Sequence, residues 1–160
     1  MRLTHYSDFA LRLLMLLALE PDELHTVEEA ARRYGISRNH LTKVAHRLVQ
    51  SGFVGSRRGR GGGLRLTKRP EAINLGAVVR ATEDNFVLVE CFDRERNNCV
   101  LTAACGLRGP LEEALLAFLA VLDGYSLADL VKKPATFQRM RRLLAADRKR
   151  PNVAARHEPL

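Results

Sequence analysis

The residues with the most evident chemistry are three cysteines, Cys91, Cys99 and Cys105, which form a C-x7-C-x5-C pattern. They lie in the stretch 90–109, which shows neither helical nor strand periodicity. An irregular polar segment can fold around a metal group, whereas structural thiols usually lie among apolar residues. Three thiolates fit an iron–sulfur cluster completed by a ligand from elsewhere, or a zinc site. Zinc sites more often carry C-x2-C pairs, and none occurs here. Thiol sensing and unreactive thiols remain alternatives.

The composition favours a polyanionic partner. The chain has 160 residues, a net charge of +8 and a pI near 10.0, which suits nucleic acid or an anionic membrane surface. No apolar run is long enough to cross a bilayer. The apolar run 13–19 follows Asp8 and Arg12 and is not followed by a signal-peptide cleavage site. An odd number of cysteines argues against a disulfide framework. We therefore expect a soluble, cytoplasmic protein without a membrane segment.

A helix-turn-helix is predicted within residues 26–51. Thr26 and Glu29 fit a capping box at the start of a short helix, 27–34. Gly35 opens the turn to a second helix, 37–51, for which Ser37 is the N-cap. This second helix has one apolar face, formed by Leu41, Val44, Ala45, Leu48 and Val49. The opposite face is polar, and no acidic residue occurs from 37 to 69.

Two short strands, 53–54 and 64–67, joined by a glycine- and arginine-rich tip, predict a β-hairpin wing. Glycines let a backbone approach a phosphate, and arginines at such a tip can enter a minor groove. A solvated basic loop is the simpler alternative, but helix, turn, helix and wing occur in register. We expect DNA contacts from Thr26, Ser37, Arg38, Asn39, His40, Thr42, Lys43, Arg47, Arg57, Arg58, Arg60, Gly61 and Gly62. Those near the start of the second helix suit base edges, whereas His40 and the wing arginines suit phosphates.

The remaining segments complete a mainly α fold. A first helix starts between residues 4 and 7 and ends before Pro21, with Asp8 paired to Arg12 at i+4. Asn74 caps a helix that runs to about 82. After Pro110 comes a long helix that is apolar nearly all round, so it needs burial on several sides. A partner subunit would provide this, and a central place in its own monomer is the alternative.

We divide the chain into a winged helix-turn-helix DNA-binding domain, 1–83, and a cysteine-containing loop, 84–109. A dimerisation helix with a following short helix spans 110–133, and a C-terminal helix with a basic tail spans 134–160. Nothing resembles a catalytic nucleophile with its base or a phosphate loop, so an enzyme is not expected. His25, His40 and His46 are expected at the surface.

Three stretches carry a resemblance to the NsrR repressors, the nitric-oxide-sensing branch of a bacterial winged-helix family that also contains IscR. They are residues 3–12, 35–44 and 58–66, together with the three cysteines, and the similarity spans about 1–133. The resemblance implies a homodimer that binds a palindromic operator and carries one cluster per subunit. The cluster is implied to be [4Fe-4S], held by Cys91, Cys99, Cys105 and Asp8 of the partner subunit, with nitric oxide as the signal.

IscR-type relatives hold [2Fe-2S] and place a histidine three residues after the last cysteine. Arg108 occupies that position here, and arginine is not a plausible iron ligand, so [2Fe-2S] is the less favoured alternative. The spacing between Cys91 and Cys99 is wider than the family usually shows. Two other functions remain open: a redox-, iron- or metal-sensing regulator of the same fold, and a nucleic-acid binder without a sensor or sequence preference.

Overall fold

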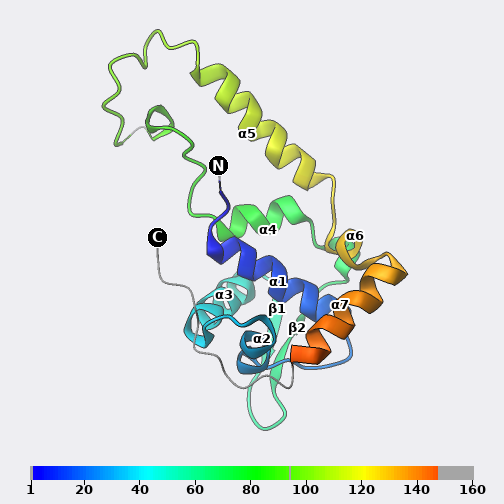
Figure 1. Ribbon diagram of the computed structural model, residues 1–160. Helices are drawn as coiled ribbons and strands as arrows, with labels where there is room; N and C mark the ends of the chain where they lie inside the picture. The colour runs from blue at the N-terminus through cyan, green and yellow to red at the C-terminus, as the bar shows by residue number, and fades with distance from the viewer. Residues whose placement is uncertain (1, 94, 148–160) are drawn as a thin grey trace.

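The computed structural model describes residues 2–93 and 95–147. The elements are, in order, α1 His5–Leu19, α2 Val27–Tyr34, α3 Arg38–Gln50, β1 Val54–Arg57, β2 Gly63–Leu66, η1 Pro70–Ala72, α4 Leu75–Thr82, η2 Glu90–Phe92, α5 Arg108–Asp123, α6 Leu127–Val131 and α7 Pro134–Asp147. Most helices pack into one body, from which α5 and the loop before it project (Figure 1). The predicted mainly α, winged helix-turn-helix fold is confirmed.

Helix α1 is the centre of the core. Thr4 caps it by accepting a hydrogen bond from the backbone N–H of Ser7 at 3.3 Å. Nine of its residues are buried, and it packs against α3, α4 and α6. The buried hydroxyls of Ser7 and Thr82 lie 2.7 Å apart and join α1 to α4. Because the apolar side chains of α1 face several helices at once, this helix fixes the other elements relative to one another.

Glycines terminate both helices of the helix-turn-helix. Gly35 adopts the left-handed conformation (φ 63°) after α2, and the N–H of Ile36 donates to Ala31 O. After α3, the N–H groups of Gly52 and Phe53 donate to Val49 O and Leu48 O, and Gly52 has φ 73°. Both arrangements satisfy carbonyls that the helix leaves without a partner. The predicted positions of these two helix ends are confirmed.

The wing is a two-stranded antiparallel hairpin, in which Val54 pairs with Leu66 and Arg57 with Gly63. The first strand is longer than predicted, so Arg57 belongs to the strand rather than to the tip. At the tip, Gly59 and Gly61 have left-handed φ values of 96° and 73°. The side-chain position of Gly62 is closed, because a Cβ there would lie 2.2 Å from Arg57 O. This turn therefore requires glycine for reasons of backbone geometry.

Helix α5 is anchored to α4 at its C-terminal end. Arg80 donates two hydrogen bonds to the Asp123 carboxylate, at 2.5 and 2.7 Å, and these hold the pKa of Asp123 below its usual value. Gly76 makes this approach possible, since a Cβ there would lie 2.0 Å from Asp123 Oδ1. The Asn74 amide also donates to Asp123 O, at 2.7 Å. The C-terminal end of α5 is thus bonded to α4 at this point.

Two details differ from the sequence-based expectation. Helix α5 begins at Arg108, so Pro110 is its third residue rather than its first. Proline is tolerated there because the first N–H groups of a helix have no intrahelical acceptor. The predicted basic tail, 148–150, lies outside the described residues. None of the helices within the described ranges is long and apolar enough to cross a membrane.

Candidate DNA-binding face and cysteine loop

The polar face of α3 carries most of the predicted DNA contacts. Arg38, Asn39, His40, Thr42 and Lys43 are exposed, while Leu41, Val44, Ala45 and Leu48 on the opposite face are buried. Nine lysines and arginines and no acidic residue occur from 37 to 69. An exposed helix face of this charge, at the second helix of a helix-turn-helix, is suited to the major groove.

Some of these side chains already have partners within the fold. The Thr42 hydroxyl donates to Arg38 O at 2.8 Å, which leaves its oxygen able to accept a hydrogen bond. Arg47 donates from Nε to Ala81 O, at 2.8 Å, so it ties α3 to α4. The Tyr6 hydroxyl donates to Lys43 O at 2.7 Å and ties α3 to α1. Side-chain hydrogen bonds therefore join α3 to both α1 and α4.

The two predicted capping residues behave differently. Thr26 accepts a hydrogen bond from the N–H of Glu29 at 3.1 Å, so its oxygen is used within α2. Ser37 stands at the N-cap of α3 but makes no side-chain capping bond. Its hydroxyl is thus available beside the first turn of α3, where backbone N–H groups favour an anion such as phosphate. The contacts of both residues with DNA stay predictions.

The wing presents the second part of the basic face. Arg57, Arg58 and Arg60 are exposed at and beside the tip, and Arg65 is exposed on β2. None of the ion pairs among the described residues involves the wing arginines. A guanidinium group without an ion pair can contact a phosphate or a narrow minor groove at a small cost in free energy, because no internal ion pair must first be broken.

The three cysteines lie on the connection between α4 and α5. Cys91 belongs to η2, whereas Cys99 and Cys105 lie in irregular positions next to turns, and all three are free thiols of intermediate exposure. The loop has its own hydrogen bonds: the N–H of Asn98 donates to Glu90 Oε1 at 2.6 Å, and the Thr102 hydroxyl donates to Cys99 O at 2.8 Å. Since the loop is longer than 20 residues without an α-helix or strand, it depends on local bonds of this kind.

Within the described residues, the three thiols are not arranged as ligands of a single metal ion. Among the described residues, only Glu20, Glu23 and His25 form a group of three whose potential ligand atoms all lie within 4.8 Å of one another. The cysteines form no such group, as one zinc ion would require. An iron–sulfur cluster spreads its thiolate ligands over several iron atoms, so it tolerates wider spacing. Free, partly exposed thiols on a loop without an α-helix or strand are compatible with that use.

Asp8 lies in the first turn of α1, and its predicted partnership with Arg12 is present. Arg12 Nε donates to Oδ1 at 2.9 Å, and Nη2 lies 2.7 Å from Oδ2. The Asp8 side chain is nevertheless 40% exposed, so it remains accessible from outside the subunit. Its role as an iron ligand of another subunit stays a prediction, and it would require the carboxylate to be shared with or released by Arg12.

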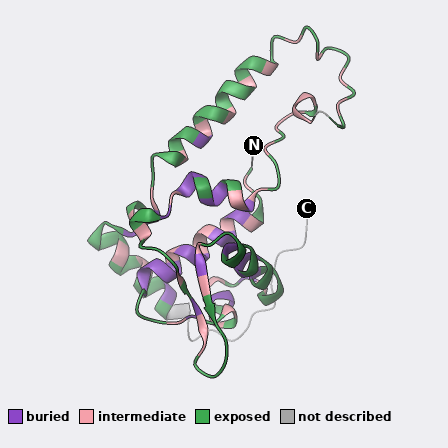
Figure 2. Ribbon diagram, turned by 180° about the vertical axis from the view of Figure 1, so that it is seen from behind, coloured by how far each residue is buried: buried purple, intermediate pink, exposed green. Residues whose placement is uncertain are grey.

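Helix α5 exposes the apolar surface that suggested a dimer. Only Leu119 is buried among its residues, while Leu116 and Val121 are each 61% exposed (Figure 2). A groove of about 580 Å³ lies between α5 and the segments 2–4 and 83–89, and Leu111, Leu115 and Phe118 line it. An apolar helix and an apolar groove exposed side by side are typical of a surface that another chain covers. The alternative of α5 at the centre of its own monomer is wrong, because α5 projects from the body.

The expectation of a surface position for His25 is also wrong. Its side chain is 0% exposed, and its backbone pairs with Leu64 of the wing strand β2. Arg33, with a side-chain exposure of 0%, lies in the same buried cluster and bonds Glu20 and Glu29. Neither burial is evident from local sequence, because that of His25 depends on a contact with the wing and that of Arg33 on how α1 and α2 meet.

Comparison with known proteins identifies the family. Residues 3–133 match the Rrf2 family, described as "Iron-dependent Transcriptional regulator". The chain is 57% identical to the HTH-type transcriptional regulator NsrR of Bacillus subtilis (strain 168) over 133 residues, which cover 82% of this chain and 91% of that protein. It is 51% identical to NsrR of Halalkalibacterium halodurans over 144 residues, covering 89% and 99%.

Among solved structures, the global cysteine regulator CymR of B. subtilis shares the fold, with a TM-score of 0.67 and 24% identity over 82% of this chain and 97% of CymR. The curated relatives are named as transcriptional regulators, not as enzymes. A helix-turn-helix with a basic wing, three free thiols on the following loop and this degree of identity agree with one another. The chain belongs to the Rrf2 family of transcriptional regulators, as an NsrR-type member.

Proposed function

We propose that the protein is a homodimeric repressor of the bacterial cytoplasm that binds a palindromic operator and releases it when nitric oxide is present. In this proposal each subunit holds a [4Fe-4S] cluster through Cys91, Cys99 and Cys105, with Asp8 of the partner subunit as the fourth ligand. The observation that carries the proposal is the place of the three thiols. They lie on the segment that joins the DNA-binding domain to the exposed apolar helix α5.

This place allows a change in the loop to reach the recognition helix. The loop enters from α4, and α4 bonds α3 through Arg47 and Ala81 O at 2.8 Å. The loop leaves into α5, whose far end is bonded to α4 through Arg80 and Asp123. A dimer reads two half-sites only when the spacing of its two recognition helices matches the groove repeat. A loop tied to the partner's α1 would hold that spacing, and a released loop would not.

When bound, the cluster would supply iron able to bind nitric oxide, with a hard carboxylate as a weaker ligand than the soft thiolates beside it. The residues of the chain explain why release of Asp8 costs little. Arg12 lies four residues away and pairs with both Asp8 oxygens, at 2.9 and 2.7 Å. A carboxylate that leaves the loop therefore returns to a guanidinium on its own helix. Exposed pairs of this kind are weak, so Arg12 competes with the partner's loop without preventing its attachment.

The first test measures iron, sulfide and visible absorption on protein purified without oxygen, followed by titration with nitric oxide in the presence of labelled operator DNA. We expect about four irons per chain, an absorption band that nitric oxide bleaches, and loss of DNA binding over the same range. About two irons per chain would instead support the IscR-like alternative. Iron-free protein that binds DNA and ignores nitric oxide would refute the proposal and favour a thiol-based or metal-sensing regulator.

The role of Asp8 is separated from its salt bridge by two matched variants. Asp8→Ala and Arg12→Ala both remove the same ion pair, but only Asp8→Ala removes a carboxylate ligand. We expect Asp8→Ala to lower the iron content and the sensitivity to nitric oxide, and Arg12→Ala to retain both. Equal behaviour of the two variants would assign Asp8 a structural role only.

Hybrid dimers test whether the ligand comes from the other subunit. One chain carries Asp8→Ala, and the other carries Cys91→Ser, Cys99→Ser and Cys105→Ser. If Asp8 acts across the interface, this hybrid has one complete site, made from the cysteines of the first chain and the aspartate of the second. If Asp8 acts within its own subunit, it has none. One cluster with retained nitric-oxide sensitivity is the expected result, and its absence would overturn ligation between subunits.

A further inference from the structure

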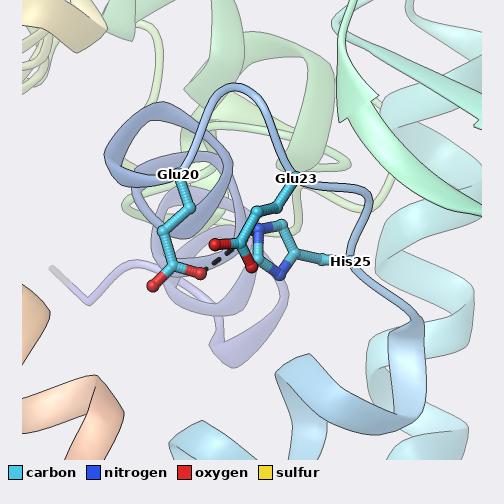
Figure 3. A group of neighbouring side chains, drawn as sticks. All are labelled: Glu20, Glu23 and His25. Atoms are coloured by element: carbon cyan, nitrogen blue, oxygen red, sulfur yellow. Dashed lines mark ion pairs between the residues drawn. The ribbon is translucent and has the colours of Figure 1, made fainter.

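A second cluster of side chains with metal-binding potential lies between α1, α2 and the wing. Figure 3 shows Glu20, Glu23 and His25 converging on one point beneath the turn that joins α1 to α2. Their potential ligand atoms all lie within 4.8 Å of one another. Glu20 and His25 are 8% and 0% exposed, whereas Glu23 is exposed. The group is thus closed on the protein side and open to solvent through Glu23.

His25 is the observation that points to a ligand. Its side chain is completely buried, and neither Nδ1 nor Nε2 has a hydrogen-bond partner among the described residues. The nearest carboxylate oxygens lie 3.4 Å from Nε2, on Glu20, and 3.7 Å from Nδ1, on Glu29. Buried polar groups are nearly always hydrogen-bonded, and each exception needs an explanation. Each ring nitrogen faces a different carboxylate, and a metal ion bound between the imidazole and the carboxylates would supply the partner that the ring lacks.

Three carboxylates and one guanidinium surround the His25 ring. Glu20, Glu23 and Glu29 contribute three carboxylates, and Arg33 contributes one guanidinium, bonded to Glu20 Oε2 at 2.8 Å and Glu29 Oε1 at 2.6 Å. Carboxylate oxygens and an imidazole nitrogen within 4.8 Å of one another form a donor set that a divalent transition-metal ion accepts.

We propose that Glu20, Glu23 and His25 form a binding site for a divalent transition-metal ion that secures the base of the wing. An imidazole beside carboxylates suits zinc, iron(II) or manganese(II), whereas calcium and magnesium prefer oxygen ligands throughout. Solvent completes the coordination on the open side, next to Glu23. The site is separate from the cysteine loop and does not depend on the proposed cluster.

The connection with the wing is made by the backbone of His25. Its N–H donates to Leu64 O at 3.2 Å, and its carbonyl accepts from the N–H of Leu64 at 2.8 Å. The next strand residue, Gly63, packs so closely that a Cβ there would lie 3.0 Å from His25 N and O. A metal ion that holds the His25 ring therefore holds the start of β2, and through it the arginine-rich tip that follows β1.

The site is tested by measuring zinc binding to the full-length chain. The chain carries Cys91→Ser, Cys99→Ser and Cys105→Ser, because the cysteine thiolates would otherwise bind zinc. We expect calorimetry to find one zinc ion per chain. In this background Glu23→Gln and His25→Gln should each weaken binding by at least roughly tenfold, the order of loss that removal of a ligand or its support causes. Asp22→Asn, in the same exposed turn, is the matched control and should bind normally.

Glu23→Gln keeps the test decisive even if His25→Gln fails to fold, since Glu23 is exposed. No zinc uptake at millimolar zinc, or uptake that survives Glu23→Gln, would overturn the site. The effect on the wing is read from hydrogen exchange of the His25 and Leu64 amides. With free zinc at about 100 times the dissociation constant, linkage predicts about 100-fold slower exchange at these two amides. Unchanged exchange with zinc bound would overturn the proposed connection to the wing.

Discussion

Replacement of Arg60 by alanine should alter the salt dependence of operator binding in a calculable way. Arg60 is exposed at the wing tip between two left-handed glycines, Gly59 and Gly61, and takes part in none of the ion pairs within the described ranges. Each phosphate contact contributes about 0.9 to the slope of log affinity against log salt concentration. A dimer has two wings, so Arg60→Ala should reduce the slope by about 1.8.

This reduction in slope corresponds to a large difference in affinity between the wild-type protein and the variant. Between about 50 and 200 mM salt, a difference of about 1.8 in slope amounts to a factor of about 12. The wild-type protein should therefore lose about 12-fold more affinity over that range than the variant. Phosphate contacts position a protein without reading sequence, so the preference for operator over random DNA should change little.

The assay is fluorescence anisotropy of labelled operator over a series of potassium chloride concentrations. Arg139→Ala is the matched control, because Arg139 is exposed on α7 and lies outside the wing. The control should retain the wild-type slope. A wild-type slope in Arg60→Ala, or an equal reduction in both variants, would refute the assignment of the wing tip to phosphate contact.

Three further predictions concern the tip, the dimer and the alkaline limit of stability. Gly62→Ala should weaken DNA binding with little change in melting temperature, because its Cβ would lie 2.2 Å from Arg57 O and must displace the exposed tip. Leu116→Asp should lower the molecular mass in sedimentation toward that of the monomer, since this 61% exposed side chain belongs to the proposed interface. Burial raises the pKa of Tyr34 to about 12 from 10.0 in the unfolded chain, and its hydroxyl donates to Arg12 O. The buried neutral side chain of Tyr34 therefore contributes about 2–3 kcal/mol to the free energy of unfolding. This contribution is complete below pH 10.0 and is lost as the pH rises through 12.

Each of these predictions has its own control. Gly106→Ala, at a position where a Cβ meets nothing within 4 Å, should leave DNA binding unchanged. Leu143→Asp, on α7 and 64% exposed, should leave the mass unchanged. Tyr34→Phe should remove this alkaline loss. A monomer from Leu143→Asp, tight DNA binding by Gly62→Ala or an unaltered alkaline loss in Tyr34→Phe would contradict the corresponding reasoning.

Much of the fold was predictable because its signals are local. Thr4, Thr26 and Asn74 each accept a hydrogen bond from a backbone N–H three residues later, so each helix start depends on a side chain beside it. Gly35 and Gly52 mark helix ends through their left-handed backbone. The Asp8–Arg12 pair spans one helical turn. Features of this kind involve residues within four positions of one another, and the sequence alone therefore indicates them.

The buried cluster was not predictable in the same way. His25 lies in a polar stretch, and its burial depends on pairing with Leu64, 39 positions later in the chain. Arg33 looks like an ordinary exposed cation in its helix, yet it is buried between Glu20 and Glu29. Charged residues are seldom buried unless they are paired, and the pairing here depends on how α1 and α2 meet.

The sequence by itself determined the helices, the turn, the basic wing and the three thiols, because periodicity, caps and residue chemistry act over a few residues. Only the tertiary structure decided that Arg80 bonds Asp123 across 43 positions, that Arg47 ties α3 to α4, and that α5 projects with an exposed apolar face. These contacts join segments whose separation along the chain leaves no periodic signal. They exist because α4 packs against both α3 and α5.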